Sequence, residues 1–146
     1  MENISFKDGL EEAVLFCFYE DGKILLEDRG KGFDVEAFYP NGGIEIKDKF
    51  NDNYIINALH REIKEEFNNQ ININNHIYCG DVVVTDINAI FYVYLITDWT
   101  GVFPESIKEP GEKDSLISFF NIDEAKELFN YQSAFDILEL IVKKIW

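Results

Sequence analysis

Basic residues are scarce in this chain, and the scarcity excludes one class of partner. Its 146 residues include 13 lysines and arginines against 28 aspartates and glutamates, which gives a formal net charge of −15. Binding to a nucleic-acid backbone needs a basic face, so we expect no duplex nucleic acid as a partner. An anionic substrate would need a metal ion to bridge it to so acidic a protein. Solubility alone explains the acidity equally well.

Cysteines are few, and long apolar runs are absent. Cys17 and Cys79 each lie in an apolar, strand-like run, which predicts two buried, reduced thiols in a cytoplasmic protein. No apolar run approaches the roughly eighteen residues of a membrane span, and Met1 to Leu10 lacks the order of a signal peptide. We therefore expect no membrane partner. With 47% hydrophobic residues, residues 1–146 should form a single domain with a substantial core.

Apolar runs separated by turn residues predict a chain of strands and three helices. We expect Met1 to Glu12 to be a lead-in with little regular structure, and Asp21-Gly22 to join two antiparallel strands in a hairpin. The expected strands are 13–19, 23–28, 35–39, a short one around Ile71 and Ile73, 76–85, 89–97 and 115–120. The expected helices are a central one over about 55–67, a short one at 125–129 capped by Asn121 with Glu124, and 132–145, whose core positions are Phe135, Leu138, Ile141 and Val142.

The central helix carries the chemistry. Ile55, Leu59, Ile63 and Phe67 recur every fourth position and form a core-facing stripe. Glu62, Glu65 and Glu66 border this stripe and span about 100° of the helix. Carboxylates so close repel one another, and a hard divalent cation with oxygen ligands is the usual compensation. Taken alone, however, the pattern is also typical of a solvated acidic face with i,i+4 pairs such as Arg61–Glu65.

A glycine pair precedes this helix. The run from Phe38 to Glu45 reads as a strand that stops at Pro40 and at the pair Gly42-Gly43. Glycines allow a backbone to approach a ligand or metal closely. His60 and His76, the only histidines, lack partners at metal-ligand spacing, so we expect structural roles for both.

Together these segments resemble the box of the Nudix hydrolases, G-x5-E-x7-R-E-U-x-E-E-x-G-U, with U apolar. Arg61, Glu62, Ile63, Glu65 and Glu66 match its second half. In the first half Gly42 stands at the first glycine and Asp48 at the glutamate, and twelve residues separate Asp48 from Arg61 where the family has seven. The five extra residues lie within 49–53 and lengthen a loop at small thermodynamic cost. Asn68 replaces the closing glycine and suits the same left-handed conformation.

The resemblance implies a Nudix α/β/α sandwich with a mixed sheet and a site for Mg²⁺ or Mn²⁺. The implied metal ligands are Glu62, Glu65, Glu66 and a backbone carbonyl at or near Gly42, with Arg61 orienting a box glutamate. Glu62 serves as a ligand or helps to activate water.

Further residues follow from the resemblance outside the box. Arg29, or Lys31 in its place, would face substrate phosphates, although an exposed rim charge explains either. The loop 98–114 contains prolines and glycines that exclude a helix, and Glu109 or Glu112 in it would complete the site or act as a base. Solvated loop charges are the competing explanation.

The expected function is metal-dependent pyrophosphohydrolysis of a nucleoside diphosphate linked to another group, by attack of water on phosphorus. The altered first half of the box favours an alternative, an inactive Nudix-like module that binds a nucleotide or a protein. An acidic protein without any ligand site is a third reading. The partner of the enzyme is a small nucleotide substrate of unspecified identity, and the sequence is compatible with a homodimer.

Overall fold

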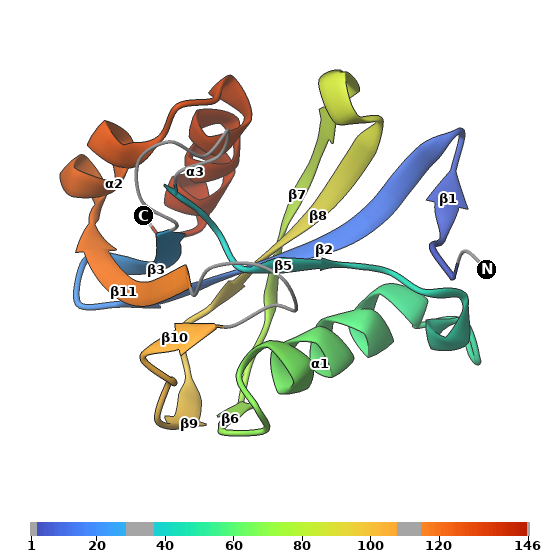
Figure 1. Ribbon diagram of the computed structural model, residues 1–146, viewed down its shortest axis with the longest axis horizontal. Coiled ribbons are helices and arrows are strands. Elements are labelled where there is room, and N and C mark those ends of the chain that lie inside the picture. The colour runs from blue at the N-terminus through green and yellow to red at the C-terminus, as the bar shows by residue number, and fades with distance from the viewer. Residues whose placement is uncertain (1–2, 29–36, 108–114, 146) are drawn as a thin grey trace.

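The computed structural model describes residues 3–28, 37–107 and 115–145 (Figure 1). Its strands are β1 (Phe6–Lys7), β2 (Leu10–Glu20), β3 (Lys23–Asp28), β4 (Ala37–Phe38), β5 (Asn41–Gly43), β6 (Ile71–Ile73), β7 (Ile77–Val84), β8 (Ala89–Ile96), β9 (Trp99–Gly101), β10 (Ser106–Ile107) and β11 (Ser115–Asn121). The helices are α1 (Tyr54–Glu66), α2 (Ile122–Leu128) and α3 (Gln132–Ile145), with short 3-10 turns η1 (Ile46–Asp48) and η2 (Thr85–Ile87).

The long strand β2 lies at the centre of a mixed sheet. The strand order is β10-β11-β3-β2-β8-β7, with β1, β4 and β5 paired to β2 or β3 beside this path. β2 and β8 run parallel, from Glu11 opposite Ala89 to Phe18 opposite Ile96, whereas the other paired strands are antiparallel. The predicted mixed sheet is therefore confirmed.

Helices cover both faces of this sheet and bury two separate cores (Figure 1). Successive side chains of a strand point to opposite faces. Accordingly, Leu15 and Cys17 of β2 join the core with α2 and α3, and Phe16 and Phe18 join the core with α1. The result is the expected α/β/α sandwich, with α1 alone on one face. No helix within the described ranges is long and apolar enough to cross a membrane.

The lead-in predicted for residues 1–12 is wrong in its second half. There Phe6–Lys7 pairs with the start of β2, and Asp8 and Gly9 form the turn between them with φ of 53° and 81°. Asp21 and Gly22, at 51° and 79°, form the predicted hairpin in the same way. An Asp-Gly pair favours such turns because both central residues need positive φ. The first pair gave the same signal as the second.

Other predictions differ from the structure in detail. The third helix has the predicted bounds, but its buried residues are Ala134, Ile137, Leu138 and Ile141. Phe135, predicted to be in the core, is 37% exposed, and its ring contacts that of Phe129 edge-on. The segment 98–107 contains the short strands β9 and β10, and the expected strand 35–39 appears as β4 within its described part. Cys17 and Cys79 are buried and free, as predicted.

Candidate metal centre

The candidate site lies between α1 and the segment that follows β5. Ala58, Leu59 and Ile63 on the inner face of α1 are buried against the sheet. The stripe fixes the rotation of the helix, so the next residues around the helix, Glu62 among them, lie at the edge of the core. This placement of the box helix agrees with the prediction.

Glu62 packs directly on Gly42. A methyl group at Gly42 would lie 2.0 Å from Oε2 of Glu62, a distance that no real contact allows. Only glycine leaves room for the carboxylate at this position. The side chain of Glu62 is 12% exposed, and burial raises its pKa, with further repulsion from Glu65 and Glu45 and an opposing effect of Arg61.

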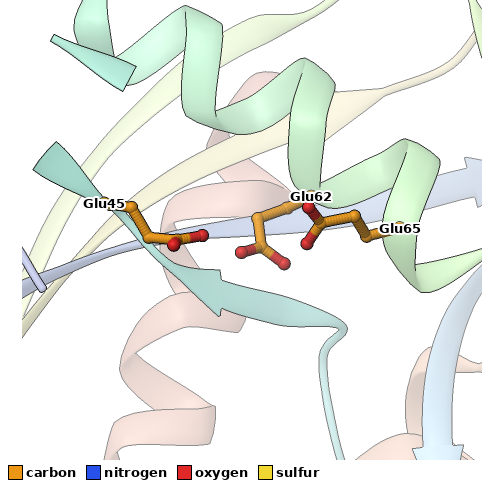
Figure 2. A group of neighbouring side chains, drawn as sticks. All are labelled: Glu45, Glu62 and Glu65. Carbon is orange, nitrogen blue, oxygen red and sulfur yellow. The ribbon is translucent and has the colours of Figure 1, made fainter. Parts of the chain in front are cut away.

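Glu45, Glu62 and Glu65 form the carboxylate cluster (Figure 2). One oxygen from each lies within 4.8 Å of the others, and Figure 2 shows the three side chains turned toward one another from the segment after β5 and from α1. A hard divalent cation takes carboxylate oxygens as ligands. The set of three carboxylate donors therefore fits Mg²⁺ or Mn²⁺.

Arg61 holds the carboxylate cluster together. Its Nη1 donates to Glu62 at 2.8 Å and to Glu65 at 3.1 Å, and lies 2.9 Å from Oε2 of Glu45. One guanidinium nitrogen thus touches all three carboxylates. The predicted Arg61–Glu65 pair is confirmed.

The edge of the guanidinium formed by Nε and Nη2 binds Asp48. Nε and Nη2 of Arg61 donate to the two oxygens of Asp48, each at 2.8 Å, and Nη2 also donates to the carbonyl of Gly43 at 3.0 Å. Asp48 is 3% exposed, and although burial opposes the charge, hydrogen bonds from Arg61 and from the backbone of Glu45 lower its pKa. Bidentate pairing of this kind fixes geometry as well as charge. The longer loop therefore still brings Asp48 onto Arg61, and its correspondence to the first glutamate of the box stays a prediction.

The five extra residues are tied to the start of α1. Asn57 donates from Nδ2 to the carbonyl of Asp48 at 3.0 Å and to Oδ1 of Asn51 at 2.9 Å. Oδ1 of Asn51 also accepts from the backbone of Asn53 at 2.9 Å. At the other end of the helix Asn68 has a φ of 51°, the left-handed conformation predicted for the residue in place of glycine.

The predicted site residues have different outcomes. Glu62 and Glu65 join the cluster beside Gly42, but the cluster contains Glu45 rather than Glu66, whose side chain is half-buried. The ligand roles of Glu66 and of the Gly42 carbonyl stay predictions. Arg29, Lys31, Glu109 and Glu112 lie outside the described residues.

Sequence reasoning did not select Glu45 as a ligand. The residue follows Gly42-Gly43 and Ile44 directly, so an acidic side chain next to a glycine pair was the available signal. The structure also brings His60 and His76 together, with ring centroids 5.9 Å apart. Within the described ranges neither belongs to the group of candidate metal ligands.

The sequence matches no family model and no curated protein. Solved structures nevertheless share the fold. An ADP compounds hydrolase has 17% identity and a TM-score of 0.65, with 92% of this chain and 72% of that chain covered. A MutT Nudix hydrolase from Burkholderia pseudomallei has 19% identity and a TM-score of 0.66, with 89% and 96% covered. A chain in the complex between the C-terminal domain of mouse MUTYH and human PCNA has 13% identity and a TM-score of 0.59, with 91% and 88% covered.

Proposed function

We propose, with the Nudix fold of this chain as the premise, that the protein is a metal-dependent pyrophosphohydrolase. Its substrate would be a nucleoside diphosphate linked to a second group, and an ADP-linked compound is the first choice because one similar structure is described as an ADP compounds hydrolase. Water would attack a phosphorus of the diphosphate, break one P–O bond of the bridge and leave two phosphate-containing products.

The carboxylate cluster is the observation that carries this proposal. Glu45, Glu62 and Glu65 place one oxygen each within 4.8 Å of the others on a protein of net charge −15. So acidic a surface repels a diphosphate, and a divalent cation bound by the three carboxylates would offset most of their negative charge and give the diphosphate oxygens a positive centre to bind.

The residues of this chain would divide the work. A bound Mg²⁺ or Mn²⁺ supplies positive charge for the diphosphate oxygens and makes water a better nucleophile. Arg61, anchored on Asp48, orients the cluster, and Glu62 would serve as a ligand or help to activate the attacking water. Glu66 remains a further proposed ligand, and Glu109 or Glu112 a further base.

A second candidate function is binding without turnover. The same fold occurs in the structure of the complex between the C-terminal domain of mouse MUTYH and human PCNA. In this chain Asp48 replaces a glutamate and the box carries five extra residues. A nucleotide-binding or protein-binding module would keep the site geometry and lose hydrolysis.

Cleavage of a panel of nucleotides separates the two functions. ADP-linked sugars, dinucleoside polyphosphates and nucleoside triphosphates should be incubated with Mg²⁺ or Mn²⁺, and products should be measured by chromatography. We expect Glu62→Gln to reduce turnover at least about a hundredfold, as expected for a group that takes part in proton transfer.

Glu139→Gln is the matched control. Glu139 is 70% exposed on α3 and pairs only with Lys143 in the described structure, so its loss should leave turnover unchanged. Nucleotide binding by the native chain without any metal-dependent product would establish the binding module instead.

A further inference from the structure

A buried carboxylate beside the candidate site has no part in the function proposed above. Glu12 of β2 is 1% exposed. It continues the row of Val14, Phe16 and Phe18 that faces α1, where the apolar pattern of the core would favour another hydrophobic residue. A buried charge is costly unless it is paired and hydrogen-bonded, so the chain must hold Glu12 by specific contacts.

Four side chains from separate parts of the chain meet Glu12. Oε1 accepts from Ser5 at 2.6 Å and lies 3.7 Å from Nζ of Lys49. Oε2 accepts from Tyr54 at 2.5 Å and from Tyr92 at 2.6 Å. Although burial opposes the charged form, these contacts lower the pKa of Glu12, which keeps it a carboxylate at neutral pH.

Two of these contacts lead directly to the candidate site. Tyr54 is the first residue of α1, and Lys49 follows Asp48, the partner of Arg61. Lys49 also lies over the ring of Tyr54, 4.8 Å from its centroid. Tyr92 belongs to β8 and connects Glu12 to the sheet.

We propose that Glu12 is a positioning residue, which holds the start of α1 and the five-residue insertion against the sheet through Tyr54 and Lys49. In that position the insertion keeps Asp48 on Arg61, and the helix keeps Glu62 and Glu65 opposite Glu45. The inference rests on the proposed function, since it assigns Glu12 to the geometry of the same metal site.

Two tyrosines on one oxygen provide a matched test. Tyr54→Phe and Tyr92→Phe each remove one hydroxyl from Oε2 of Glu12, and both keep the ring, whereas Glu12→Gln leaves a buried amide and risks the fold. Each variant should be measured for Mn²⁺ affinity by titration calorimetry and for amide hydrogen exchange. We expect Tyr54→Phe to weaken Mn²⁺ binding on the order of tenfold, the lower end of the loss seen when a group that orients a metal ligand is removed. Tyr92→Phe should lower the melting temperature with Mn²⁺ binding unchanged.

Hydrogen exchange separates this proposal from the proposed function. Tyr54→Phe should accelerate exchange in residues 46–58, and Tyr92→Phe should not. Native protein that binds no Mn²⁺ would refute the metal site, and the exchange data would still decide the role of Glu12. Equal effects of the two variants on residues 46–58, or no effect of Tyr54→Phe there, would overturn the positioning role.

Discussion

Arg61 is the residue on which the charge balance of the site depends. It neutralises buried Asp48 through two hydrogen bonds of 2.8 Å. Replacement by glutamine would leave this carboxylate buried without its cation, so we expect Arg61→Gln to lower the free energy of unfolding by about 3–5 kcal/mol. Urea denaturation in a chelating buffer measures the change.

Lys47 offers the comparison for this experiment. It lies 3.8 Å from Oε2 of Glu45 with a side chain that is 61% exposed. Exposed ion pairs contribute little, so Lys47→Gln should change stability by less than about 1 kcal/mol. Similar small losses for both substitutions would show that Asp48 does not depend on Arg61.

Glu62 should lower the stability of the metal-free protein at neutral pH. Its pKa is raised above the ordinary 4.5, so the folded state holds the proton more tightly than the unfolded state. The stability that this preference gives is present below pH 4.5 and is lost as the pH rises through the folded pKa. In metal-free buffer, the advantage of Glu62→Gln over the native chain should therefore grow from pH 4 to pH 8. Thermal unfolding at a series of pH values tests this, and an advantage that shrinks over the same range contradicts it.

Single site residues were predictable where the contact is local. Arg61 and Glu65 are one helical turn apart, and Asp48 was selected from its spacing in the sequence after Gly42. Glu45 was not predictable in the same way, because its approach to Glu62 depends on how the segment after β5 packs on α1. That packing joins parts of the chain that share no short-range pattern.

At the scale of the elements, the stability of α1 depends on the conformation of the residue that follows its last turn. Asn68 directly follows the helix-terminating Phe67 and has a φ of 51°. This left-handed conformation costs an ordinary residue about 1–2 kcal/mol and costs glycine almost nothing. We expect Asn68→Ala to lower the unfolding free energy by about 1 kcal/mol, and Asn68→Gly to maintain or raise it.

Chemical denaturation of these two variants gives the comparison. Asn72→Ala, at an exposed position of β6 without positive φ, controls for the loss of an asparagine side chain and should change stability by about 0.5 kcal/mol or less. If alanine at position 68 were as stable as glycine, the left-handed end of α1 would be refuted.

Elements with strong local signals were predicted closely. The bounds of β3 and α3 agree with the sequence, and Asn121 caps α2 with the reciprocal bonds to Glu124 that its spacing indicates. The rotation of α3 was harder to predict, because Phe135 and Ile137 are equally apolar and only the shape of the sheet beneath them decides which is buried. The short strands β9 and β10 lie among prolines and glycines, which indicate turns, so the sequence did not predict that these few residues pair as strands.

At the scale of the whole molecule, acid should unfold the protein by a defined route. Although burial opposes ionisation in each, hydrogen bonds hold the pKa of Glu12 below 4.5 and that of Asp48 below 3.8. Stability from these groups is present above those ordinary values and is lost as the pH falls through the lowered ones. Circular dichroism should therefore show unfolding below about pH 4.

A double variant isolates the contribution of these two groups. Glu12→Gln combined with Asp48→Asn should be less stable than the native chain at pH 7 and should lose less stability between pH 5 and pH 3. A native-like loss in the double variant would place the acid sensitivity elsewhere.

The resemblance of the box was enough to predict the sandwich, but not the strand pairing within it. β2 and β8 pair in parallel, with Glu11 opposite Ala89, and these two residues are far apart in the sequence. The sequence of an apolar strand of this kind does not indicate which strand pairs with it. The arrangement of the sheet therefore follows from packing of the whole chain.

The contact of one Arg61 nitrogen with three glutamates has a practical consequence for handling the protein. Arg61 already pairs with all three glutamates, so removal of divalent ions by a chelator should leave the chain folded, in contrast to small zinc domains that unfold on demetallation. Occupancy of the site would then follow the concentration of free divalent ion in the surroundings, so a metal-free stock of the protein could be stored and loaded by adding the salt.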